Sequence, residues 1–300
     1  MENRYDVIII GGSYAGLSSA MSLGRSLRKV LVIDSGKPCN AQTPHSQNFL
    51  TQDGKTPKEI STIAKEQVEK YKTVEFYEGL ATAGIKTENG FEITTENGEN
   101  FSSKKLIFAT GIVDEVPNIK GFKECWGISL IHCPYCHGYE FKNKKTGIIA
   151  NGDRGFHIIS LVSNLTKDLT IFTRGKADFT DEQLEKLNKN NIKIIETEIE
   201  ELKHQNGMVE SLIISDGKVL NFDVVYGPSP FTQHSNIAES LGCEMTEIGH
   251  IKIDQFQKTN VAGFLACGDN SSPMRSVANA VYTGNLAGAM VNTELVGESF

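Results

Sequence analysis

Two cysteines, Cys133 and Cys136, are separated by two residues, and His137 follows them directly. Thiols at this spacing can cycle between a dithiol and a disulfide. A neighbouring imidazole raises the fraction of thiolate, which is the nucleophilic form of a thiol. The same arrangement also fits half of a zinc site or the attachment site of a c-type haem. These residues alone therefore indicate three possible chemistries.

The composition of the chain favours the redox chemistry. Six cysteines in 300 residues are too few for a disulfide scaffold, and no second cysteine pair or H-x-x-H cluster completes the ligands of a zinc site. The N-terminus lacks the order of basic, apolar and small residues of a signal peptide. We therefore expect a cytoplasmic protein, which argues against haem attachment because that step normally follows export. We predict no metal site.

Charge and hydropathy argue against two classes of partner. The formal net charge is −7 at pH 7, whereas a surface that binds nucleic acid usually needs a basic excess. No apolar run approaches the roughly 18–20 residues needed to cross a bilayer. We expect neither a nucleic-acid partner nor a membrane span.

The N-terminal segment predicts a unit that binds a dinucleotide. A short apolar strand from Tyr5 to Ile10 leads into a turn of small residues, and a helical pattern follows. A second strand, residues 29–33, ends on Asp34, at the separation from the turn at which an acid reaches an adenosine ribose. Small residues let backbone N–H groups approach a diphosphate at the helix N-terminus. The predicted binding residues of the turn are Gly11, Gly12, Ser13, Ala15 and Gly16.

Two later junctions complete the pattern of a flavin site. Each is a short apolar strand that ends in small or polar residues, and a helix predicted over 274–291 follows the second. The carboxylate of Asp269 can accept hydrogen bonds from a ribityl hydroxyl, and the helix N-terminus can face the electron-rich pyrimidine edge of a flavin. The residues of these junctions are Ala109, Thr110, Gly111, Gly268, Asp269, Ser276 and Val277.

These residues resemble the low-molecular-weight thioredoxin reductase family over essentially the whole chain. The motifs that carry the resemblance are residues 11–16, 109–111, 133–136, 227–230 and 267–269. The resemblance implies an α/β fold of two doubly wound, Rossmann-like nucleotide-binding domains, the second inserted in the first. It implies a FAD-binding domain formed by residues 1–113 and 232–300, and an NAD(P)-type domain, residues 114–231, that carries the cysteine pair. It also implies a homodimer.

Two segments, residues 45–54 and 133–140, resemble a narrower group, the gliotoxin-oxidase-like dithiol oxidases. These flavoenzymes close a disulfide in a small molecule and pass the electrons to oxygen. Thioredoxin reductases usually carry an aspartate after the second cysteine, where this chain has His137. The resemblance implies that Asn48 contacts the isoalloxazine edge and that His45 lines the flavin or substrate pocket.

The inserted domain has lost features of an NADPH site. Its strand–turn–helix segment has Ala150 in place of the first glycine, and a helix is predicted from His157 to Leu165. The next strand leads to Arg174, where an NADPH enzyme of this family would have His-Arg-Arg, with arginines around the 2′-phosphate. We therefore expect that NADPH does not bind tightly. Altered NADPH binding and another electron donor both stay open.

The family resemblance assigns Cys136 to the flavin and Cys133 to the substrate. We predict that a substrate thiolate attacks Cys133, that Cys136 passes the electrons to FAD, and that His137 is the general base. His132 is the alternative base. The predicted partners are a small dithiol or disulfide and molecular oxygen, or a thioredoxin-like protein if electrons flow from NADPH or another donor to a protein disulfide. A flavin-bound redox sensor that turns nothing over is a third alternative.

Overall fold

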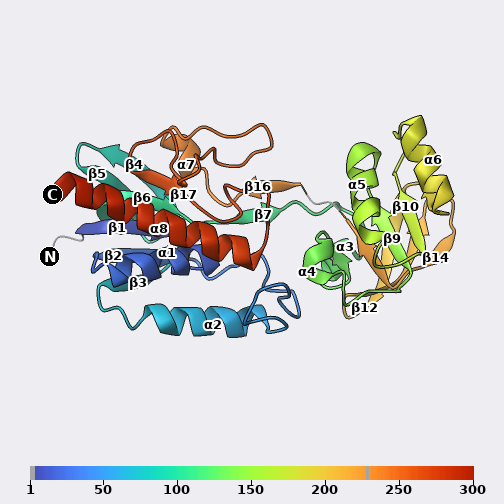
Figure 1. Ribbon diagram of the computed structural model, residues 1–300, viewed down its shortest axis with the longest axis horizontal. Coiled ribbons are helices and arrows are strands. Elements are labelled where there is room, and N and C mark those ends of the chain that lie inside the picture. Colours follow the sequence, from blue (N-terminus) through green and yellow to red (C-terminus); the bar gives the residue numbers. More distant parts are fainter. Residues whose placement is uncertain (1–3, 228–229) are drawn as a thin grey trace. The chain divides into compact units, whose positions relative to one another are not determined.

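The computed structural model describes residues 4–227 and 230–300 and divides into two compact units (Figure 1). The first unit consists of the described part of Met1–Ala41, with Phe49–Val113 and Phe231–Phe300. The second consists of Gln42–Asn48 and the described part of Asp114–Pro230. The motif at residues 227–230 lies partly outside the described residues. None of the helices in the described ranges is both long and apolar enough for a membrane span.

The first unit is built on a seven-stranded sheet in the order β3-β2-β1-β6-β5-β4, with β17 beside β6. Strands β3, β2, β1, β6 and β17 run parallel to one another. Strands β5 and β4 follow β6 at one side of the sheet in antiparallel pairs. The strands are β1 Arg4–Ile10, β2 Val30–Asp34, β3 Val74–Glu78, β4 Ala81–Thr87, β5 Gly90–Thr95, β6 Asn100–Phe108 and β17 Phe264–Ala266. The helices are α1 Tyr14–Arg25, α2 Pro57–Val68, α7 Ile237–Ser240 and α8 Val277–Ser299. Strands β7 Ile112–Asp114 and β16 Phe231–Gln233 pair with each other.

The second unit has a five-stranded parallel sheet in the order β11-β10-β9-β15-β8 and a three-stranded ribbon, β12-β13-β14. Its strands are β8 Leu130–Ile131, β9 Thr146–Ile149, β10 Leu169–Phe172, β11 Lys193–Ile195, β12 Ile199–Gln205, β13 Met208–Ile214, β14 Val219–Asn221 and β15 Val224–Tyr226. Its helices are α3 Phe122–Cys125, α4 Pro134–His137, α5 Gly152–Val162 and α6 Asp181–Lys189. Two α/β units, one with a mostly parallel and one with a parallel sheet, confirm the predicted fold class.

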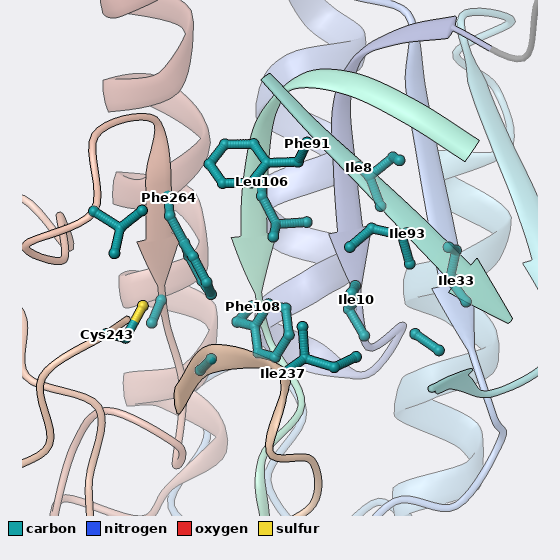
Figure 2. Packing of buried hydrophobic residues seen from close by; sticks show 14 of the residues in the cluster. Ile8, Ile10, Ile33, Phe91, Ile93, Leu106, Phe108, Ile237, Cys243 and Phe264 are labelled. Carbon is teal, nitrogen blue, oxygen red and sulfur yellow. The ribbon is translucent and has the colours of Figure 1, made fainter. Parts of the chain in front are cut away.

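Strand β1 is buried on both faces of its sheet. Ile8 and Ile10 belong to one apolar cluster and Val7 and Ile9 to another, because successive side chains of a strand point to opposite faces. Figure 2 shows the first cluster, which contains these isoleucines and Phe264 of β17, whose ring packs against Phe91 and Phe108. The burial fixes β1 in the middle of the sheet, and with it the turn that leads into α1.

Helix α8 lies along α1 in the first unit (Figure 1). Gly284 of α8 approaches α1 so closely that an added Cβ would overlap the carbonyl oxygen of Ala15. Ser19 Oγ donates a hydrogen bond to the carbonyl oxygen of Gly284 at 2.8 Å. The absence of a side chain at position 284 therefore sets the distance between the two helices.

We expect Gly284→Ala to lower the free energy of unfolding of the first unit by about 1–3 kcal/mol, because the added methyl group forces α1 and α8 apart. Thermal unfolding followed by circular dichroism measures the change. Gly297→Ala is the matched control in the same helix, since its added Cβ meets nothing within 4 Å, and alanine there should be neutral or stabilising. Equal destabilisation by both substitutions would contradict this account of the contact.

Two helix predictions are wrong at their ends. The helix predicted from His157 begins at Gly152, because Asn151 supplies an N-cap that accepts the N–H of Gly152. The last helix, predicted over 274–291, is α8, Val277–Ser299. Its start is set by Ser276, whose side chain accepts the N–H of Asn279.

Candidate functional site

The cysteine pair lies in the second unit, where Cys133 and Cys136 form a disulfide with their Cα atoms 5.3 Å apart. Cys133 is the N-cap of the short helix α4, and Pro134 follows at the first position, where a missing N–H costs little. The backbone N–H of Cys136 donates to Sγ of Cys133 at 3.1 Å. Such a donor stabilises a thiolate. The local backbone therefore favours a negative charge on Cys133 once the disulfide opens.

His137 ends α4, directly after Cys136. Burial lowers the pKa of the His137 imidazole below its ordinary value of 6.5. The ring is therefore neutral at pH 7 and can accept a proton, which a general base must do. The lowered pKa supports the general-base role of His137, but that role is still a prediction.

The lowered pKa of His137 predicts the pH dependence of dithiol oxidation. At constant concentration of the protonated dithiol, the rate should stay level down to about pH 6.5 and fall at lower pH, because the base is lost only when the imidazole is protonated. His137→Gln should lower the rate at pH 7 by about 10²-fold and remove the acid limb. Steady-state rates between pH 5 and pH 8 test this. An acid limb that His137→Gln retains would assign it to another group.

The residues on either side of the pair are held by packing. An added Cβ on Gly138 would overlap the carbonyl oxygen of Pro134, so this position accepts only glycine without movement of α4. The ring of His132 stacks on Trp126 with centroids 5.7 Å apart. Trp126 in turn donates from Nε1 to a carboxylate oxygen of Asp114 at 3.1 Å. His132 thus has a packing role, and its use as the alternative base stays a prediction.

The turn between β1 and α1 is shaped by glycines. Gly11 has a φ of +102°, which favours glycine, and a Cβ there would overlap the carbonyl oxygen of Ala109. A Cβ on Gly16 would overlap the carbonyl oxygen of Gly11. The N–H of Gly12 donates to Oδ1 of Asp34 at 3.0 Å. The structure therefore brings the predicted turn and the predicted acid together.

The N-terminus of α1 is suited to an anion. Its N-cap, Ser13, makes no side-chain capping bond among the described residues, and the first turn contains no acidic residue. The first N–H groups of a helix need partners from outside the helix and carry partial positive charge. Ala15 is buried behind this turn. A diphosphate fits the end of the helix in both shape and charge.

The two later junctions lie at the carboxyl edge of the same sheet, on the neighbouring strands β6 and β17. Nδ2 of Asn270 donates to the carbonyl oxygen of Phe108 at 3.0 Å and to Oγ1 of Thr110 at 3.3 Å. The N–H of Gly268 donates to Oγ1 of Thr283 at 3.0 Å. These bonds hold the segments around Gly111 and Gly268 against one another.

The N-terminus of α8 adds charged groups to this edge. Oδ2 of Asp269 lies 3.8 Å from Nε of Arg275. Ser276 caps α8, and Val277 is its first residue. Oδ1 of Asn270 is buried and makes no hydrogen bond with the described residues, which indicates a position for a further donor such as water or a cofactor.

These residues fit FAD. The end of α1 would hold the diphosphate, Asp34 the adenosine ribose, Asp269 the ribityl chain, and the start of α8 the pyrimidine edge. Asn270 and Thr283 were missed by the sequence analysis, although an amide directly after Gly-Asp was a visible signal.

Asn48 and His45 belong to Gln42–Asn48, which packs with the second unit, whereas the predicted boundaries assign it to the FAD-binding domain. Asn48 has a φ of +59°, in the left-handed region that asparagine tolerates better than most residues. Contacts of these two residues with a flavin stay predictions. In the described ranges, no three side chains of His, Cys, Asp or Glu are grouped so that they could hold a metal ion.

Helix α5 follows β9 in the second unit as α1 follows β1 in the first. Its N-terminus differs because Asn151 caps the N–H of Gly152 at 2.9 Å and Asp153 lies in the first turn. Nε of Arg174, the arginine predicted to remain near a 2′-phosphate, donates to Oε2 of Glu198 at 2.9 Å. The groups that would bind a nucleotide in this unit therefore already have partners within the chain.

Comparison with known proteins agrees with this arrangement. The sequence model of the pyridine nucleotide-disulphide oxidoreductases matches residues 5–284. Thioredoxin reductase tcpT of Claviceps purpurea is 31% identical, over 99% of this chain and 96% of that protein.

Two solved structures are similar along their whole length. A putative thioredoxin reductase TrxB from Bacillus anthracis superposes with a TM-score of 0.93 at 30% identity, over 99% of this chain and 100% of that one. An oxidoreductase from Agrobacterium tumefaciens gives a TM-score of 0.91 at 35% identity, over 99% of each chain. The chain belongs to the pyridine nucleotide-disulphide oxidoreductase family and is a flavin-dependent disulfide oxidoreductase of the low-molecular-weight thioredoxin reductase type.

Proposed function

We propose that this enzyme oxidises a small dithiol to a disulfide, with FAD bound in the first unit and dioxygen as the final electron acceptor. The observation that carries the proposal is the Cys133–Cys136 disulfide with the half-buried imidazole of His137 directly after it, whose pKa is lowered by burial. A cytoplasmic homodimer, with an FAD-binding domain of residues 1–113 and 232–300 and an inserted domain of residues 114–231, forms part of the proposal.

The reaction begins at Cys133. A substrate thiol gives its proton to His137, and the thiolate attacks Sγ of Cys133, so that a mixed disulfide forms and Cys136 leaves as a thiolate. The second substrate thiol loses its proton to the solvent and its sulfur attacks the first, which closes the substrate disulfide and releases Cys133 as a thiolate. The N–H of Cys136 stabilises the charge on Cys133 in this second step. The substrate has lost two electrons, and the cysteine pair has gained them.

The reduced cysteine pair must give up its two electrons before the next turnover. Bound FAD would take the electron pair from the reduced cysteines and deliver it to dioxygen, which becomes hydrogen peroxide. The chain's own part in this step is to restore the Cys133–Cys136 bond and to hold the cofactor through the turn at residues 11–16 and the junctions at residues 109–111 and 268–269.

The second unit favours a dithiol over NADPH as the electron donor, because the groups that would bind NADPH have other partners. Arg174 is paired with Glu198, and the N-terminus of α5 carries its own cap and the acidic Asp153. A bound NADPH would have to displace Glu198 from Arg174, an exposed pair whose loss costs little, and place its diphosphate beside the carboxylate of Asp153, which repels it.

A second candidate is an enzyme that passes electrons from NADPH, or from another donor, to a disulfide in a thioredoxin-like protein. The comparisons favour it over dithiol oxidation, because several of the similar proteins carry the name thioredoxin reductase. Both candidates use the same cysteine pair and differ in the direction of electron flow.

Aerobic turnover distinguishes the two candidates. With dithiothreitol in air, dithiol oxidation predicts continuous oxygen consumption and one hydrogen peroxide per disulfide formed, with NADPH absent. The second candidate predicts oxidation of NADPH that depends on added thioredoxin. Rapid thioredoxin-dependent NADPH oxidation, together with peroxide formation no faster than without enzyme, would reject dithiol oxidation.

A further inference from the structure

In doubly wound units a dinucleotide places its diphosphate at the N-terminus of the helix that follows the first strand. In the second unit this helix is α5, which follows β9. The family to which the chain belongs therefore implies a pyridine nucleotide at this helix end. The residues present do not fit that ligand, because the chain itself occupies the position.

Residues 176–178, here called the capping segment, are bound to the N-cap of α5. Oδ1 of Asn151 accepts the N–H of Gly152 and the N–H of Asp178, both at 2.9 Å. Nδ2 of the same side chain donates to the carbonyl oxygen of Lys176 at 2.9 Å. One amide therefore joins the capping segment to the helix through three hydrogen bonds.

The capping segment also lies directly against the first residue of α5. Gly152 has a φ of +56°, and an added Cβ there would lie 3.3 Å from the carbonyl oxygen of Asp178 and 3.7 Å from its Oδ2. The carboxylate thus stands at the positive end of the helix, where a phosphate would bind. Asp153 adds a second negative charge in the first turn and accepts a hydrogen bond from Gln183 at 2.7 Å.

The capping segment belongs to the loop that follows β10, and acidic residues after β11 hold the start of this loop. Oε1 of Glu196 accepts the N–H of Ala177 at 2.7 Å, and its carbonyl oxygen accepts the N–H of Gly175 at 2.7 Å. Arg174 is held by Glu198. The backbone and the arginine that could meet the adenosine end of a dinucleotide are therefore engaged within the chain.

A cavity of about 680 Å³ beside the capping segment has the wrong charge for a nucleotide. Ala177 and Glu196 line it together with apolar side chains. Its other charged residues are Asp216 and Lys218, which form an ion pair with each other at 2.7 Å. The negative charge of Glu196 is therefore not balanced by a cation in the cavity lining. This charge repels phosphate.

We propose that the capping segment takes the place of a dinucleotide diphosphate at the N-terminus of α5, so that the second unit has no pyridine-nucleotide site while the segment is bound there. The inference rests on the proposed function, in which a dithiol supplies the electrons. An occupied nucleotide site explains why NADPH does not supply them. The two α/β units of one chain then differ in use: the N-terminus of α1 is left to a ligand, and that of α5 is occupied by its own chain.

Isothermal titration calorimetry of the FAD-loaded protein with NADPH tests the proposal. The wild-type protein should show no saturable binding up to about 1 mM NADPH. Asn151→Gly combined with Asp178→Ala removes the three hydrogen bonds and the carboxylate, while glycine is itself accepted at an N-cap. This double variant should bind NADPH at least about tenfold more tightly than the wild-type protein.

Two variants serve as controls. Glu182→Gln removes an exposed acidic charge from the same unit and should leave NADPH binding unchanged. Asp178→Ala alone keeps the N-cap and should give an intermediate affinity, so a double variant that fails to fold does not end the test. Micromolar binding by the wild-type protein, or equal binding by wild type and Asp178→Ala, would overturn the proposal. Flavin reduction by dithiothreitol, measured on the same samples, reports on the proposed function separately.

Discussion

Replacing either Cys133 or Cys136 with serine is expected to lower dithiol oxidation by about 10³-fold or more, as when a covalent nucleophile is removed from an enzyme. A serine oxygen cannot form the mixed disulfide or take part in restoring the Cys133–Cys136 bond. The FAD content should stay at the wild-type level, because the residues that fit FAD are elsewhere in the sequence. Oxygen consumption with dithiothreitol and the ratio of flavin to protein absorbance measure the two quantities.

Cys39→Ser is the matched control for these substitutions, since Cys39 is an exposed cysteine that is not part of a disulfide. It should retain the wild-type rate. A serine variant of the pair that keeps more than about a tenth of wild-type turnover would show that electrons reach the flavin without the disulfide.

Gly16→Val should abolish FAD binding. The new side chain would overlap the carbonyl oxygen of Gly11, so the turn between β1 and α1 would have to open at the place where the diphosphate fits. The purified variant should be colourless, with a flavin-to-protein ratio about tenfold or more below the wild-type ratio. This corresponds to a loss of about 1.4 kcal/mol or more in the free energy of FAD binding. Absorbance of the dialysed protein measures this ratio.

Gly98→Ala is the control for loss of a glycine as such. Gly98 has a positive φ, unlike Gly16, and its added Cβ meets nothing within 4 Å, so the cost of alanine there is limited to backbone strain. Its FAD content should equal that of the wild-type protein. If Gly16→Val also bound a full complement of FAD, the assignment of the diphosphate to the N-terminus of α1 would be wrong.

The first nucleotide-binding unit could be predicted from the sequence because its signals are local. An apolar strand, a turn of small residues and a second strand that ends in Asp34 all fall within the first 34 residues. The structure joins them as expected, through the hydrogen bond from Gly12 to Asp34. The disulfide was equally local, since its two cysteines are only three positions apart in the chain.

The bonds that depend on tertiary structure could not be predicted. Asn270 reaches residues that lie about 160 positions earlier in the chain. The hydrogen bond from the N–H of Asp178 to Asn151 could not be predicted either, because these residues are 27 positions apart. Replacement of a glycine by Ala150 indicated that the second nucleotide site had changed, but it did not indicate what occupies the helix end.

The central claim is that a dithiol, and not NADPH, reduces the flavin through the Cys133–Cys136 disulfide. Anaerobic stopped-flow mixing of the FAD-loaded protein with excess dithiothreitol, and separately with excess NADPH, tests it most directly. We predict that the dithiol bleaches the flavin absorbance within one catalytic turnover time, whereas NADPH bleaches it far more slowly. Bleaching by NADPH within that time, or no bleaching by dithiothreitol, would contradict the claim.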